Sequence, residues 1–132
     1  MHAVLTGHAK SVTAVAWSPD GTRLGSVGWD GALRTWRAPT GAIVPELSIG
    51  GRDLREVTPN PTSDRLLVAA QEYGALSGAL AVVTAATLAV EFVIEEPSAQ
   101  VGIHAWSPDG ARFAYGLWDG RVSVRQASDR SE

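Results

Sequence analysis

The side chains of this sequence that could do chemistry together lie near its N-terminus. His8, Ser26 and Asp30 are the residue types of a hydrolase triad, in which the aspartate orients the histidine and the histidine deprotonates the serine. Nothing in the sequence resembles the Gly-x-Ser-x-Gly turn that presents such a serine, or a loop that would stabilise an oxyanion. Because a triad is defined by geometry and not by residue types, catalysis is the weaker interpretation.

Metal and phosphate chemistry find less support still. The other histidines, His2 and His104, are scattered along the chain, whereas zinc needs three or four converging ligands, usually at short spacings. The pair Gly50-Gly51 lacks the strand, glycine-rich loop and helix that bind phosphate. Glu95-Glu96 is most simply a solvated loop. We therefore expect no metal ion, no cofactor and no enzyme.

Composition limits the class of protein. The 132 residues allow one ordinary domain, and 45% of them are hydrophobic. The net charge of −3 and the scattered basic residues give no reason to expect nucleic acid or a membrane surface as a partner. The absence of cysteine excludes a disulfide framework and a thiolate metal site. With no signal-like N-terminus and no apolar run near ~20 residues, we expect a cytoplasmic protein.

The elements that must position these residues are short strands. Apolar runs alternate with turns rich in Gly, Pro and Asp, which is typical of an all-β chain. The Ala- and Val-rich run 79–94 is interpreted as two strands because of its β-branched residues. The predicted strands are 2–6, 12–17, 23–28, 32–36, 42–47, 54–58, 65–70, 79–83, 88–94, 101–106, 112–117 and 121–125.

The chain also contains an internal repeat. SPDG stands at 18–21 and again at 107–110, and WDG stands at 29–31 and again at 118–120, so both motifs recur after 89 positions. Between them, NPTSDRL from Asn60 aligns with SPDGTRL from Ser18. This predicts three repeats of forty-odd residues, the middle one degenerate and with a longer loop over 71–78.

From Gly7-His8 to Trp36 the sequence resembles the WD-repeat family of β-propellers. The resemblance implies an all-β propeller arc of three four-stranded antiparallel blades. Blade one would span about 8–48, blade two about 49–94 and blade three about 95–126. The strand over 2–6 would complete blade three, within the chain or across a dimer.

Three blades do not make a ring, because propellers generally have four to eight. Two copies could close a six-bladed ring, or the chain could be part of a larger propeller. The strand count favours the homodimer slightly, and both alternatives stay open.

The resemblance also gives the candidate triad a structural interpretation, as a buried hydrogen-bond network that fixes the geometry of a blade. Its positions are His8, Ser26, Asp30 and Trp36. The third repeat keeps Asp119 but has Tyr115 and Arg125 at the Ser and Trp positions, and Pro97 where the His would be. The second repeat keeps none of the four. We therefore expect blades two and three to be less rigid.

A docking surface is predicted on the face that the family calls the top. Trp29 and Trp118 each precede a hairpin Asp, and Tyr73 lies in the corresponding loop of the second repeat. Tryptophan is over-represented among binding hot spots. The sequence thus favours a non-enzymatic interaction or scaffolding module with an unidentified protein partner. The alternatives are a fragment of a larger propeller whose function lies in the ring, and an enzyme or small-molecule site in the ring's channel.

Overall fold

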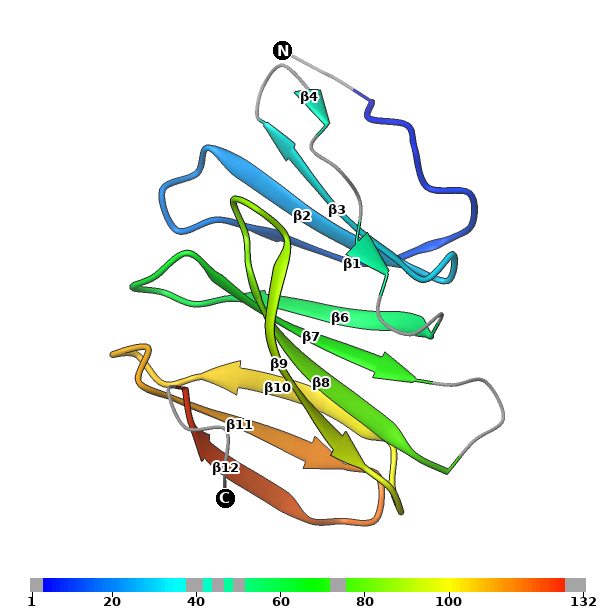
Figure 1. The fold of residues 1–132 in the computed structure, drawn as a ribbon, viewed down its shortest axis with the longest axis vertical. Helices are drawn as coiled ribbons and strands as arrows, with labels where there is room; N and C mark the ends of the chain where they lie inside the picture. Colours follow the sequence, from blue (N-terminus) through cyan, green and yellow to red (C-terminus); the bar gives the residue numbers. More distant parts are fainter. Residues whose placement is uncertain (1–3, 38–41, 44–46, 49–51, 72–75, 128–132) are drawn as a thin grey trace.

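The computed structural model describes residues 4–37, 42–43, 47–48, 52–71 and 76–127. Over these residues the chain is all-β, with three antiparallel sheets and no helix. The sheets are stacked face to face in chain order, so that the second lies between the first and the third (Figure 1). The predicted fold class, an all-β arc of antiparallel blades, is confirmed, and each sheet is called a blade below.

The strands follow one another across each blade. Blade one contains β1 (Val12–Trp17), β2 (Arg23–Gly28), β3 (Ala32–Arg37), β4 (Ala42–Ile43) and β5 (Leu47–Ser48), the last two both pairing with β3. Blade two contains β6 (Asp53–Pro59), β7 (Arg65–Gln71), β8 (Gly78–Thr84) and β9 (Ala89–Glu96). Blade three contains β10 (Val101–Trp106), β11 (Arg112–Leu117) and β12 (Val122–Gln126).

Two predicted strands differ from the structure. The strand over 42–47 is described only as the short pieces β4 and β5. No strand forms over residues 4–6, and residues 2 and 3 lie outside the described part of the chain. The reason is the distance along the stack. The N-terminal segment lies against blade one, whereas β12, the strand that it was expected to pair with, lies at the opposite end of the molecule (Figure 1). The chain therefore does not complete blade three by itself.

Blade two supplies most of the core because both of its faces are covered. Successive side chains of a strand point to opposite faces, and β7 and β8 are apolar at nearly every position. Leu66, Val68 and Ala70 pack with Val27 and Leu33 of blade one. The alternate positions Leu67, Ala69, Leu80 and Val82 pack with Phe113, Tyr115 and Leu117 of blade three. This burial explains why β8 lacks a polar face.

The repeated SPDG segments form the same turn twice. The amide of Gly21 donates to the carbonyl of Ser18 at 3.0 Å, and the amide of Gly110 donates to Ser107 at 2.8 Å. Both glycines have a φ of 73°, a left-handed conformation that side chains with a Cβ rarely adopt. The repeat in the sequence is therefore a repeat of backbone geometry, with each turn at the end of the first strand of its blade.

Candidate functional site

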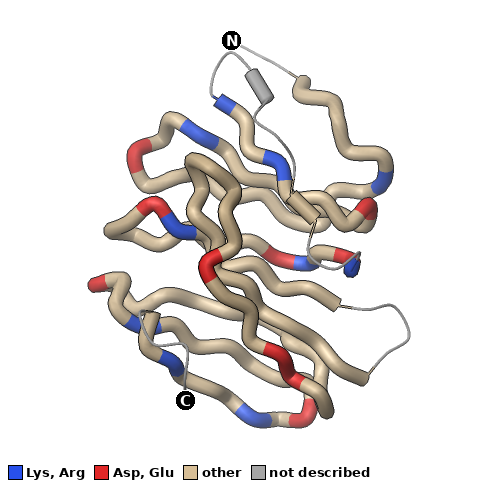
Figure 2. Tube along the Cα trace, in the orientation of Figure 1, with Lys and Arg blue, Asp and Glu red and all other residues tan. Residues whose placement is uncertain are grey.

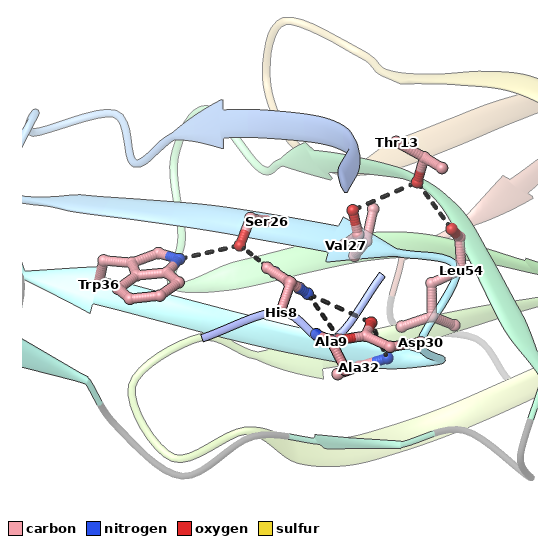
Figure 3. Close-up of polar contacts among 9 residues, drawn as sticks. All are labelled: His8, Ala9, Thr13, Ser26, Val27, Asp30, Ala32, Trp36 and Leu54. Atoms are coloured by element: carbon pink, nitrogen blue, oxygen red, sulfur yellow. Dashed lines mark hydrogen bonds and ion pairs between the residues drawn. The ribbon is translucent and has the colours of Figure 1, made fainter. Parts of the chain in front are cut away.

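The four network residues of blade one form a continuous chain of hydrogen bonds (Figure 3). The two carboxylate oxygens of Asp30 lie 3.2 and 3.1 Å from His8 Nδ1. His8 Nε2 lies 2.7 Å from Ser26 Oγ, and Trp36 Nε1 donates to the same hydroxyl oxygen at 2.8 Å. One tautomer satisfies every group: Nδ1–H donates to Asp30, and Nε2 accepts from the serine hydroxyl. The network joins the entry segment, β2, the β2–β3 hairpin and β3.

Asp30 is the charged end of this network. Burial alone would raise the pKa of Asp30, but the backbone amides of Ala9 and Ala32 and the His8 ring donate to the carboxylate and hold its pKa below the usual value. The packing leaves no room for a larger residue at Gly28, because a Cβ there would lie 2.6 Å from the carbonyl oxygen of Ser11. The hydrogen bonds to Asp30 and the tight packing at Gly28 therefore fix the position of the Asp30 carboxylate.

The same atoms resemble a hydrolase triad in their order, so access to the serine decides between the two interpretations. Ser26 is 3% exposed, and its oxygen already accepts the indole N–H of Trp36. A nucleophile must reach the substrate and lie beside donors that stabilise an oxyanion. A buried hydroxyl held between an imidazole and an indole meets neither condition. The geometry supports a structural network in blade one.

Blade three contains a different polar chain at the equivalent place. The Tyr115 hydroxyl donates to Glu96 Oε2 at 2.5 Å, and Arg125 Nε donates to the tyrosine oxygen at 3.1 Å. Glu96 belongs to β9 and is buried, so its assignment to a solvated loop was wrong. Burial raises the pKa of Tyr115, and the hydrogen bond to Glu96 adds to this effect.

Asp119 does not join that chain among the contacts described. Its carboxylate accepts from the amide and the guanidinium of Arg121 within its own hairpin, at 3.1 and 2.8 Å. The signal that could have revealed the substitute chain is the repeat itself. An offset of 89 positions takes Gly7 to Glu96, Ser26 to Tyr115 and Trp36 to Arg125.

The two tryptophans of the predicted docking surface lie at equivalent hairpins. Trp29 is 56% exposed and Trp118 is 62% exposed. Their amides make the same contact, Trp29 with the carbonyl of Ser11 at 3.0 Å and Trp118 with Gln100 at 2.9 Å. The β2–β3 and β11–β12 hairpins lie on the same edge of the stack (Figure 1), which we call the top face. Tyr73 lies outside the described residues.

Arg55 of blade two connects the two tryptophans, and sequence analysis missed it. Its guanidinium carbon lies 5.1 Å from the centroid of the Trp118 ring, within the range of a cation–π contact. It also lines, with Trp29, Lys10, Asp53 and Gln71, a hollow of about 460 Å³. The first strand of the degenerate repeat gave no motif by which Arg55 could have been found.

Charge and metal-ligating groups are dispersed. Basic and acidic residues are interspersed along the chain, with no long stretch of one sign (Figure 2). Among the described residues no three His, Cys, Asp or Glu side chains converge as a metal site would require. That part of the chain also has no helix long and apolar enough to cross a membrane.

Comparison with known proteins agrees with this geometry. Residues 1–37 match the model of the family described as WD domain, G-beta repeat. The chain thus resembles the WD-repeat family, and the matched residues are those of its first repeat. Over 65 residues, 49% of this chain, it is 35% identical to Transcriptional corepressor LEUNIG_HOMOLOG of Arabidopsis thaliana. Over 40 residues, 30% of the chain, it is 42% identical to Ribosome assembly protein 4 of Chaetomium thermophilum. The matched stretches cover 8% of the length of each relative.

The WD-repeat assignment explains which residues are matched. The family model covers blade one as far as Arg37, which is the part of the chain that contains the complete His8–Ser26–Asp30–Trp36 network. Blades two and three are antiparallel sheets like blade one. Blade three keeps Asp119 but has Pro97, Tyr115 and Arg125 at the other three network positions. An antiparallel blade thus forms in all three repeats, whereas the family model matches the first.

Proposed function

We propose that this chain is a non-enzymatic protein-interaction module of the WD-repeat type, whose top face docks a protein partner through Trp29, Tyr73 and Trp118. The observation that carries the proposal is the pair of exposed tryptophans at equivalent hairpins, with Arg55 stacked on one of them. Tryptophan and arginine dominate binding energies at protein interfaces because they combine a large apolar surface with polar donors.

The neighbouring charges favour a protein over a nucleic acid as the partner. The hollow beside Trp29 is lined by the two cations Lys10 and Arg55 together with the carboxylate of Asp53. Mixed charge of this kind suits polypeptide side chains, whereas phosphate backbones require a basic track. A corepressor and a ribosome assembly protein among the relatives support a role in assembling other proteins.

The proposal includes the completion of the arc. Three blades leave the sheets at both ends open, so we propose that further blades cover them, supplied by a second copy of the chain or by a larger propeller that contains it. A cytoplasmic location stays a prediction from composition.

Binding of selected peptides tests the docking surface. Peptides selected from a random displayed library against the chain should lose about tenfold or more in affinity when both tryptophans are replaced, in Trp29→Ala/Trp118→Ala. The control is Val90→Ala/Val93→Ala, which changes two exposed apolar residues on the outer strand β9. Because the tryptophans are exposed, the test variant should keep the free energy of unfolding of the parent.

Two results would contradict the proposal. Peptides that bind the tryptophan variant as well as the parent would place docking elsewhere, and an unfolded variant would show that the tryptophans are structural. The enzymatic alternative has its own measurement. Ester hydrolysis by the parent that disappears in a folded Ser26→Ala variant would favour the triad.

A further inference from the structure

Blade three has an apolar sheet face that the described residues leave uncovered. Its strands alternate, and on the face turned away from blade two Arg112 and Gln126 pair at one end. The other side chains of that face are small or apolar. These residues are Ile103, Ala105, Ala114, Gly116, Val122 and Val124. Ile103, Val122 and Val124 are 77%, 74% and 62% exposed. A contiguous apolar face of this kind marks an interaction site. We call it the open face of blade three.

The same positions are buried in blade one. Counting back 89 positions from the open face gives Ala14, Ala16, Gly25, Val27, Leu33 and Thr35. Val27 and Leu33 are fully buried in the core shared with blade two, and Ala14 and Ala16 pack against it. A Cβ on Gly25 would contact Val57 and Leu66 of blade two at 3.8 and 3.9 Å. The open face of blade three therefore has the surface by which one blade receives the next.

The complementary surface is also present, on the outer side of blade one. Trp17, which is 56% exposed, stands 89 positions before Trp106. Trp106 shows what this position does when a preceding blade is present. Its indole Nε1 donates to the carbonyl of Thr58 in blade two at 2.9 Å, and its ring packs edge-on against Phe113 with centroids 5.5 Å apart. Val15, 60% exposed, is likewise the equivalent of the buried His104.

We propose that the open face of blade three binds the outer side of blade one in a second copy of this chain. Thr58 is equivalent to Ala105, 47 positions later, so the indole N–H of Trp17 would donate to the carbonyl of Ala105 in the other copy. Beside Ala105 the structure has a shallow hollow of about 210 Å³, whose lining includes Trp106, Ala114 and Val124. Trp17 occupies this hollow in the pair.

One chain supplies both halves of the contact, one at each end of its arc. Two copies related by a two-fold axis therefore make the contact twice and form a closed ring of six blades, whereas a rotation that did not close would give an open polymer. The contact continues the interface between blade one and blade two, since it uses the same strand positions. The inference deepens the assembly named in the proposed function. It is independent of the top face, because Trp29→Ala/Trp118→Ala leaves both surfaces intact.

The test is the mass of the particle in solution, measured by light scattering after gel filtration. The parent chain should give twice the 13.9 kDa of one copy. Val124→Glu on blade three and Trp17→Glu on blade one should each give folded monomers. Val93→Glu, on the outer strand β9, is the matched control and should stay a dimer. Circular dichroism of each variant reports whether the sheets persist.

Mixing the two monomeric variants separates head-to-tail binding from other arrangements. In the mixed pair, the intact blade three of the Trp17→Glu chain meets the intact blade one of the Val124→Glu chain, so association should return. Trp17→Phe keeps an aromatic side chain but removes the N–H donor, and should weaken the dimer about fivefold.

Several outcomes would overturn the proposal. A monomeric parent chain would show that another partner, such as a further blade in a longer polypeptide, covers the open face. A dimer that Trp17→Glu leaves intact would mean that two open faces bind each other. Open-ended polymers would exclude the closed pair. None of these outcomes would change the peptide-binding result, which tests the top face independently.

Discussion

We predict that His104 makes the packing of blade two on blade three sensitive to acid. The side chain is 7% exposed, and its Nδ1 lies 2.8 Å from the Thr58 hydroxyl. Burial disfavours the charged ring and lowers the pKa of His104 from 6.5 to about 4. The unfolded chain keeps the ordinary pKa and takes up a proton first as the pH falls. Stability should therefore be complete above about pH 6.5 and decline as the pH falls toward about 4.

The magnitude follows from the difference between the two pKa values. Each pH unit between them corresponds to about 1.4 kcal/mol, so the loss should reach about 2 kcal/mol at about pH 5 and about 3 kcal/mol below both values. The matched variant is His104→Val, because valine stands at the equivalent positions Val15 and Val57 of the other two blades. This replacement removes the titrating group and keeps a residue that the fold accepts.

The assay is urea unfolding followed by tryptophan fluorescence, at about pH 7.5 and about pH 5 and at one protein concentration. Between these conditions the parent should lose about 2 kcal/mol more than His104→Val. Burial raises the pKa of Glu56, which acts in the opposite sense, but Glu56 is present in both proteins and cancels in the comparison. Equal losses in parent and variant would refute the reasoning, since His104 would then titrate alike in the folded and unfolded chains.

The other predictions concern the polar chains and the N-terminus. Asp30→Ala should leave buried donors of blade one without acceptors and lower the free energy of unfolding by about 1–3 kcal/mol, and an unchanged melting curve would contradict the structural network. Tyr115→Phe should lower the free energy of unfolding by a similar amount, because Glu96 and Arg125 both lose their hydrogen bond to the tyrosine hydroxyl. An unchanged free energy of unfolding would show that this polar chain does not stabilise the fold. Deleting residues 1–6 should keep the sheets but weaken the dimer measured by light scattering, and an equally tight dimer would exclude their role in it.

The strands were predictable because their ends are marked by glycine and proline, whose backbone conformations are typical of turns. β1, β2, β10 and β11 begin and end where the sequence predicts. Each of the two blades concerned has an SPDG turn after its first strand and a WDG hairpin after its second. Glycine at positive φ and proline at a fixed φ restrict the backbone locally, so the sequence pattern determines these boundaries without reference to the rest of the fold.

The polar interior was less predictable because its partners are distant in sequence. Glu96 lies in β9 of blade two, and its side chain accepts a hydrogen bond from Tyr115 of blade three. A charged residue near a predicted loop is ordinarily solvated, and only the stacking of one blade on the next shows that this one is buried. Arg55 is a similar case, since its contact with the Trp118 ring joins two blades across the top face.

The structure of the N-terminal segment also depends on a neighbouring blade. Residues 2–7 stand 89 positions before 91–96, which lie in β9, the outer strand that pairs with β8 in the preceding blade. Among the described residues no blade precedes blade one, and residues 4–6 form no strand. β12 meanwhile pairs only with β11 among the described strands, which leaves one of its edges open. In the proposed pair, residues 4–6 of the second copy would lie beside β12, as β9 lies beside β8. Strand formation would then accompany association, because each supplies the partner that the other needs.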